Sequence, residues 1–282
     1  MPSPIVTKDQ SSGPALVEEL EKVREQRGFN RRNFIRNMAL TGVAVAGSQI
    51  LSGCGGSTVS AATVPETDVL NFALNLEYLE AEFYLIATTG SGLSAADTGA
   101  ATGPTTGGAQ VTFTDSALAQ IAAEIASDEL AHVRFLRSAL GAGAVPKPAI
   151  NLNALGVGFA NDAQFLTLAR AFEDTGVSAY AGAATLLSNN NLQVAAQILA
   201  TEALHTGALR LKVIQAGVTV PATDSQDKPP AAPSTYFNVD ANALAIKRTP
   251  SQVLSIVFAS SATGTTHGGF FPSGVNGNIN TV

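Results

Sequence analysis

A four-residue pattern that occurs twice decides the fold of this chain: Glu129-Leu130-Ala131-His132 and Glu202-Ala203-Leu204-His205. A Glu and a His three residues apart in a helix share a face, so both side chains can reach one metal ion. The pattern predicts two helices whose inner faces meet at a metal site. The alternative is that these side chains face solvent, as charged groups on Ala-rich helices usually do.

Two further segments extend the repeat. An arginine follows each histidine by five residues, at Arg137 and Arg210. A step of seven residues, which is two helical turns, separates a Glu from a Tyr in each of the other two segments. These pairs are Glu77 with Tyr84 and Glu173 with Tyr180. The same polar series is therefore present twice, which indicates an internal duplication.

Four long segments rich in Ala and Leu contain these motifs, and each has helix-ending signals. Thr114 or Asp115 and Asn161 stand at N-cap positions. The segments run over about 66–88, 115–140, 162–188 and 192–216. The short joint at 189–191 makes the third and fourth helices antiparallel, whereas 141–161 is a long crossover between the second and third. The sequence predicts an all-α four-helix bundle with this crossover, a short fifth helix over 250–260 and an irregular C-terminal tail.

One Glu from each of two helices, with Glu-x-x-His from each of the other two, resembles the ligand set of ferritin-like di-iron and di-manganese carboxylate proteins. The resemblance covers 66–217 and implies two bound Fe ions, with Mn or Zn as alternatives. It implies that the metal ligands are Glu77, Glu129, His132, Glu173, Glu202 and His205. It also implies that Tyr84 and Tyr180 lie beside ligand carboxylates. Residues 71–84, 248–254 and 268–272 further resemble the desiccation-related proteins of the ferritin-like group.

Several other residues carry weaker expectations. Glu80, whose counterpart in the second half is Gly176, is either a ligand, a neighbour of the ligands or a surface residue. Glu82 and Glu124 are expected to face solvent, and Phe135 is expected in the core.

The first 53 residues resemble a twin-arginine export signal. Arg31 and Arg32 precede a short apolar run over 38–51, and Cys54 follows in a segment that resembles a bacterial lipobox. The favoured interpretation is lipidation of Cys54, and the alternative is cleavage after Ala61. The expected organisation is therefore an export signal, a tether, the bundle and a C-terminal extension, at 1–53, 54–65, 66–217 and 218–282.

Composition excludes several classes of protein. The 282 residues are 45% hydrophobic and 13% charged, with a net charge of −6 and one cysteine. One thiol cannot build a disulfide framework or a cysteine-ligated zinc or iron–sulfur site. The acidic balance, without a basic stripe, argues against binding to nucleic acid.

The expected function is redox chemistry at a di-iron centre, with O₂ or peroxide as reactant, in a periplasmic or cell-envelope protein. The alternative is a stress- or desiccation-associated structural protein whose metal site serves folding only. Expected partners are metal ions, a membrane reached through the lipid on Cys54, and a second copy of the chain.

Overall fold

The computed structural model describes residues 64–282. The export signal, the lipidation of Cys54 and the alternative cleavage after Ala61 lie outside the described residues and stay predictions. Most of the tether predicted for 54–65 lies outside them as well.

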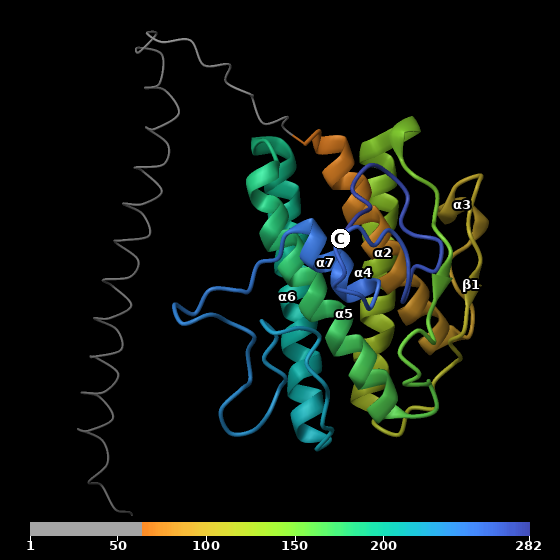
Figure 1. Ribbon diagram of the computed structural model, residues 1–282. Coiled ribbons are helices and arrows are strands. Elements are labelled where there is room, and N and C mark those ends of the chain that lie inside the picture. The colour runs from red at the N-terminus through yellow and green to blue at the C-terminus, as the bar shows by residue number, and fades with distance from the viewer. Residues whose placement is uncertain (1–63) are drawn as a thin grey trace, which may run out of the picture. The chain divides into compact units, whose positions relative to one another are not determined.

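Four long helices form the bundle, which confirms the predicted all-α fold (Figure 1). The first packs against the second and the third against the fourth, and the two hairpins meet through the first–third and second–fourth contacts. A 3₁₀ turn, Ala184–Leu186, extends the third helix. The helices are α2 (Glu66–Thr89), α4 (Ser116–Leu140), α5 (Asp162–Ala183) and α6 (Asn189–Gln215).

Side-chain caps begin α4 and α5. The Asp115 carboxylate accepts hydrogen bonds from the backbone N–H groups of Ala117 and Leu118. The Asn161 side chain accepts one from the backbone N–H of Gln164. These bonds satisfy N–H groups that have no partner within the helix, so the helix starts lie where the sequence predicted them.

The joint between α5 and α6 differs from the prediction. Residues 189–191 form the first turn of α6 rather than the loop, and the joint is Leu187 and Ser188. The Glu66 carboxylate explains this early start. It accepts hydrogen bonds from the backbone N–H of Ser188 (2.7 Å), from the Ser188 hydroxyl (3.1 Å) and from the Asn191 side-chain amide. The first turn of α6 is thereby tied to the beginning of α2.

The two long connections pair with each other through short strands. The segment between α2 and α4 contains α3 (Ala95–Thr98) and β1 (Thr105–Thr106). The crossover between α4 and α5 contains a 3₁₀ turn (Gly141–Gly143) and β2 (Ile150–Asn151). The strands β1 and β2 are parallel, with Thr105 opposite Ile150.

The connections also bury Glu82, so the expectation that it faces solvent was wrong. Its side chain is enclosed because the backbone N–H of Leu93 donates to Oε1 (3.3 Å) and the Lys147 ammonium lies 3.6 Å from the same oxygen. Lys147 also donates to the Gly103 carbonyl (2.8 Å). A buried charge is tolerated only with such partners.

The helix α7 (Pro250–Val257) begins with a capping box. The Thr249 hydroxyl accepts from the backbone N–H of Gln252, and the Gln252 side chain accepts from the backbone N–H of Thr249. The helix ends at Val257 rather than near residue 260, since Ala259 adopts a left-handed φ of 51°. It packs against α5 and lies across the front of the bundle in Figure 1.

The C-terminal tail packs back onto α2. Asn75 Oδ1 accepts from the backbone N–H of Asn276 (3.0 Å), while the Asn75 amide donates to the Asn276 carbonyl (2.8 Å). Phe270 packs edge-on against Phe172, with ring centroids 4.9 Å apart. The tail is therefore part of the folded unit.

Aromatic rings fill much of the bundle core. Phe83 stacks on Phe165 at 5.4 Å and meets Phe172 edge-on at 5.0 Å. The expectation that Phe135 belongs to this core was wrong, because its side chain is 46% exposed. Val133 and Leu136 occupy the inward positions of that turn of α4, which places Phe135 on the outer side.

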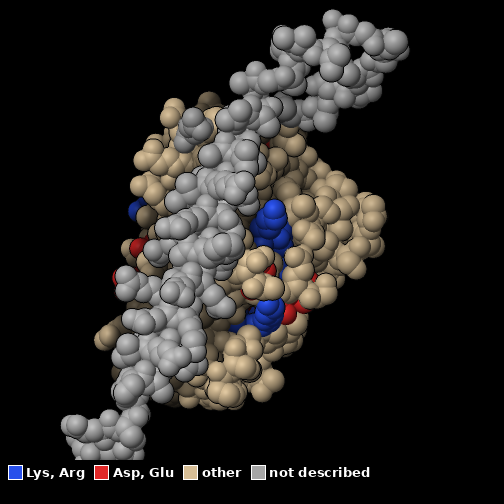
Figure 2. Space-filling view, turned by 90° about the vertical axis from the view of Figure 1, so that its left-hand side faces the viewer, with Lys and Arg blue, Asp and Glu red and all other residues tan. Residues whose placement is uncertain are grey.

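The surface is sparsely charged. On the face drawn in Figure 2, Lys and Arg side chains gather only in small groups, with acidic side chains beside the lower one. Among residues 64–282, no helix has both the length and the apolar character needed to cross a bilayer.

Candidate metal centre

All six predicted ligands converge inside the bundle. Each long helix contributes from its inward face, as the helical spacing predicted. The four glutamates are fully buried and both histidine side chains are nearly so. The residues are Glu77 on α2, Glu129 and His132 on α4, Glu173 on α5, and Glu202 and His205 on α6.

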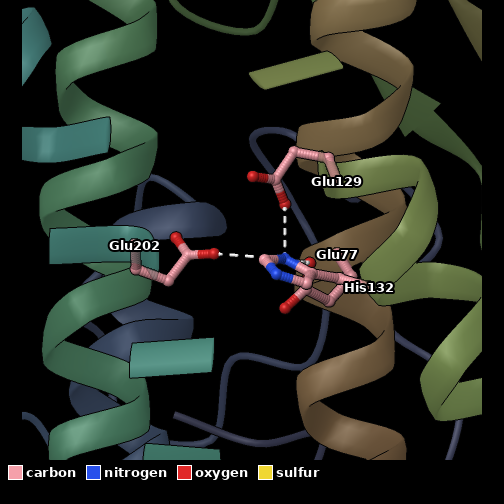
Figure 3. Close-up of side chains that lie close together, drawn as sticks. All are labelled: Glu77, Glu129, His132 and Glu202. Carbon is pink, nitrogen blue, oxygen red and sulfur yellow. Dashed lines mark hydrogen bonds and ion pairs between the residues drawn. The ribbon is translucent and has the colours of Figure 1, made fainter. Parts of the chain in front are cut away.

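Three carboxylates surround the His132 imidazole. Its Nδ1 lies 3.2 Å from Glu77 Oε2, 3.3 Å from Glu129 Oε2 and 3.4 Å from Glu202 Oε1. Figure 3 shows Glu129 and Glu202 pointing at this ring from two different helices. These four residues offer ligand atoms that all lie within 4.8 Å of one another.

A second group forms around His205. Its Nδ1 lies 3.2 Å from Glu129 Oε1 and 3.2 Å from Glu173 Oε2. The ligand atoms of Glu129, Glu173, Glu202 and His205 also lie within 4.8 Å of one another. Glu129 and Glu202 therefore belong to both groups, and each group has one Glu and one His of its own.

The protonation of the cluster reflects its burial and its charges. Burial, together with neighbouring carboxylates, raises the pKa of Glu129 and of Glu202 to about 8 and that of Glu173 to about 7. Burial would also raise the pKa of Glu77, but the charge of His132 holds it below its ordinary value. Without a metal ion the cluster therefore retains protons at neutral pH.

The pKa values of both imidazoles are raised, whereas burial alone lowers the pKa of a histidine. Burial opposes their protonation, yet the carboxylates of Glu129 and Glu173, each 3.2 Å from its Nδ1, raise the pKa of His205 to about 11. Burial likewise opposes protonation of His132, and the charge of Glu77 with the surrounding hydrogen bonds raises its pKa well above the ordinary range. The surrounding carboxylates therefore strongly favour a positive charge at the position of each imidazole.

The cluster has more acceptors than donors. Five carboxylate oxygens make no hydrogen bond within the described part of the chain: Glu77 Oε2, Glu129 Oε1, Glu173 Oε1, and both oxygens of Glu202. Each imidazole presents only one Nδ1 to them, and one N–H satisfies one acceptor well. Divalent cations would satisfy several oxygens at once, and carboxylates with imidazoles suit iron or manganese, and also zinc. The residues therefore fit a pair of metal ions.

Both predicted tyrosines lie beside the cluster. Each belongs to one half of the duplicated sequence and lies near the solitary ligand glutamate of the other half. The Tyr180 hydroxyl donates to Glu77 Oε1. Burial and the charge of Glu173 raise the pKa of Tyr84 well above its ordinary value. The Tyr84 hydroxyl nevertheless has no hydrogen-bond partner among the described residues. The two tyrosines occupy equivalent positions of the sequence repeat, but only the Tyr180 hydroxyl makes a hydrogen bond within the described residues.

The two arginines of the repeat also have matching contacts. Arg137 Nη1 donates to the Tyr78 hydroxyl (2.6 Å), and Arg210 Nη1 donates to Asp174 Oδ2 (2.6 Å). Tyr78 and Asp174 each follow the solitary ligand glutamate of their helix. The duplication read from the sequence therefore extends to side-chain contacts beyond the ligands.

Sequence reasoning missed Asp128. Its carboxylate lies 3.1 Å from Nε2 of His205, on the side of the ring that faces away from Glu173. A carboxylate at that position fixes the orientation and tautomer of a metal-binding imidazole. The repeat hid this residue, because Thr201 stands at the equivalent position and its hydroxyl bonds its own helix at Gln197.

Glu80 lies at the edge of the cluster and belongs to neither group. It is 4% exposed, and burial together with the charge of Glu202 raises its pKa well above the ordinary value. Gly176 makes room for it, because a Cβ there would lie 3.1 Å from Glu80 Oε1 and 2.6 Å from Glu202 Oε2. Of the alternatives left open by the sequence, the structure places Glu80 beside the ligands.

Comparison with known proteins agrees with the helical bundle described above. Residues 65–215 match the sequence model of a family described as ferritin-like domain. A ferritin-like catalase of Nesocodon mauritianus is 24% identical over 267 residues, which cover 76% of this chain and 84% of that protein. A desiccation-related protein of Craterostigma plantagineum is 29% identical over 168 residues, or 52% of this chain. The match spans about half the length of the desiccation-related protein, at 53%.

Proposed function

This chain belongs to the ferritin-like domain family, and we propose that it is a redox enzyme whose buried cluster holds two iron or manganese ions and turns over hydrogen peroxide. The observation that supports this most strongly is the sharing of Glu129 and Glu202 by two four-residue groups. Shared carboxylates are the arrangement that two neighbouring cations require.

Each group would hold one ion. Glu77 and His132 would bind the first, and Glu173 and His205 the second. Glu129 and Glu202 would lie between the two ions. Two divalent cations would offset the charges of four ionised carboxylates, each of which costs several kcal/mol to bury without a partner.

A bound pair of such ions supplies reversible redox chemistry that carboxylates and imidazoles alone lack. In peroxide disproportionation, two molecules of hydrogen peroxide become two molecules of water and one of O₂. Residues of this chain would hold the reactant and its protons in surroundings that exclude bulk water. Tyr180, which bonds Glu77, orients one ligand for this purpose. The name of the Nesocodon relative supports peroxide as the reactant.

Metal analysis and an oxygen electrode test the proposal together. Purified protein loaded with iron or manganese should hold about two ions per chain and evolve O₂ when hydrogen peroxide is added. Addition of Fe(II) in air, followed by absorbance, measures any ferroxidase activity of the same sample.

A pair of matched variants separates the cluster from general effects of charge. Glu202→Gln should lose both metal and turnover, because Glu202 belongs to both groups. Glu124→Gln changes an exposed carboxylate on α4 and should retain both. A protein that binds no transition metal, or that binds it without turnover, would contradict the proposal.

The likeness to a desiccation-related protein favours a second candidate, in which the bundle protects the cell and the metal only stabilises the fold. In that case the Glu77→Ala/Glu173→Ala double variant should still protect cells from drying. The native protein should then show no turnover of peroxide.

We also propose that the chain is exported and held at the cell envelope by a lipid on Cys54. The support is the Arg31-Arg32 pair and the lone cysteine behind a short apolar run. Cys54→Ser should move the protein from the membrane fraction to the soluble fraction of bacterial cells.

A further inference from the structure

A groove of about 810 Å³ runs between α5 and α7. Apolar side chains such as Leu168 and Ile256 line it together with polar ones such as Gln252 and Ser255. None of the six candidate ligands lines this groove. It lies on the outer side of α5 and needs a connection if it is to serve the metal centre.

A much smaller cavity shares part of its lining with this groove. It has a volume of about 10 Å³, which is room for about one water molecule. Its lining includes Glu80 and Gly176, from α2 and α5. Phe172, Thr175 and Val257 line this cavity and the groove alike. These three side chains border both spaces, and we call them the neck.

The inner end of the small cavity reaches the cluster. The missing side chain of Gly176 lets two carboxylates approach its backbone, because a Cβ there would lie 2.6 Å from Glu202 Oε2 and 3.1 Å from Glu80 Oε1. Glu202 Oε2 is buried without a hydrogen-bond partner in the described part of the chain, and the Glu80 side chain beside it is 4% exposed. Buried acceptors of this kind call for a donor that the protein itself does not supply.

We infer that small, uncharged reactants able to donate hydrogen bonds, hydrogen peroxide foremost, enter from the groove through the neck of Phe172, Thr175 and Val257 and meet Glu80 at its inner end. This inference rests on the proposed function and narrows its substrate class. A cavity with room for about one water molecule would admit hydrogen peroxide and exclude the larger organic hydroperoxides. The competing route is the opposite face of the bundle, where the His132 side chain is 12% exposed.

Reversible modification of a thiol introduced at the neck tests whether reactants pass through it. Thr175→Cys is made with Cys54→Ser, so that the introduced thiol is the sole one in the chain. Thr175 is suitable because its hydroxyl bonds only its own helix, at the Ala171 carbonyl (2.7 Å). Metal-free protein is treated with methyl methanethiosulfonate, and mass spectrometry measures labelling before any activity is assayed. The labelled and unlabelled proteins are then loaded with metal.

The label should lower peroxide turnover at least about tenfold at unchanged metal content, because the neck gates access. Dithiothreitol, removed before the assay, should restore the rate. Ser255→Cys is the matched control, since Ser255 lines the groove but not the small cavity. Its label should leave the rate unchanged.

Two results would overturn the inference: a thiol at position 175 that does not react, or full turnover with the label in place. Either leaves the proposed function standing if the unlabelled protein turns over peroxide. Failure of the proposed function is seen separately, as absence of turnover in unlabelled metal-loaded protein.

A second experiment compares reactants of different size and needs no labelling. Val257→Ala widens the neck, so the rate with tert-butyl hydroperoxide relative to hydrogen peroxide should rise several-fold. Val253→Ala removes the same methyl groups from a buried position of the same helix without lining the neck. An equal change of this ratio in both variants would contradict the route.

Discussion

The Tyr180 hydroxyl donates a hydrogen bond to Glu77 across the bundle, whereas the equivalent Tyr84 hydroxyl near Glu173 has no hydrogen-bond partner within residues 64–282. Tyr180→Phe should therefore destabilise the metal-free protein by about 1–3 kcal/mol, since a bond to a buried carboxylate is lost. Tyr84→Phe should not destabilise the protein, because it removes a buried hydroxyl that has no partner in the described part of the chain. Urea unfolding of both variants measures the difference. Equal losses would contradict the unequal bonding.

Asp128 contacts only one of the two histidines. Asp128→Ala should lower the affinity for the ion at His205 about 10–100-fold. The affinity for the ion at His132 should stay unchanged, so this ion becomes the more tightly bound of the two. Titration with a competing chelator measures the two affinities. Glu124→Ala, which removes an exposed carboxylate from the same helix, is the control. Parallel weakening of both ions by Asp128→Ala would refute this reading.

Gly176 leaves no space for a side chain, since a Cβ would lie 2.6 Å from Glu202 Oε2. Gly176→Ala should displace Glu202 and lower metal content, although Ala is the better helix former. Gly207→Ala is the matched control on α6, because nothing lies within 4 Å of its added Cβ. That variant should gain about 0.5–1 kcal/mol of stability. Full metal binding by Gly176→Ala would show that the cluster tolerates the shift.

Stability of the metal-free protein should fall as pH rises. The pKa of Glu129 and of Glu202 is raised from 4.5 to about 8, so their stabilising contribution is complete below pH 4.5 and lost as pH rises through 8. The pKa of His205 is raised from 6.5 to about 11, with the same sign over a higher range. The lowered pKa of Glu77 acts in the opposite sense, below pH 4.5.

Thermal unfolding between about pH 5 and about pH 9 measures this dependence. Metal-loaded protein should show the reverse trend, because ions replace the protons and bind more tightly as pH rises. Loading at neutral pH should release protons into a weakly buffered solution. A metal-free melting temperature that rises with pH would contradict the protonation described above.

The ligand cluster could be predicted because helical spacing places side chains three, four and seven residues apart on one face. The six residues are local in sequence within each helix, and the duplication supplied an internal check. Caps were predictable for the same reason, since Asp115 and Asn161 act on N–H groups two or three residues away.

What escaped prediction depends on contacts between distant segments. Glu82 is buried by Lys147 and by the connection after α2, and no local pattern indicates either. Asp128 on α4 contacts His205 on α6, and the equivalent position of the repeat holds a threonine rather than an aspartate. The first turn of α6 forms early because Glu66, at the far end of the bundle sequence, accepts its hydrogen bonds.

That contact of Glu66 has a mechanical consequence. The residue follows Pro65 directly, so any tension exerted through the preceding segment reaches α2 at the point where it is tied to Ser188 and Asn191. A pull there is shared by the first and fourth helices and cannot peel α2 away alone. If the chain is anchored through Cys54 as proposed, the bundle should resist force applied at its N-terminal end for as long as that carboxylate stays ionised.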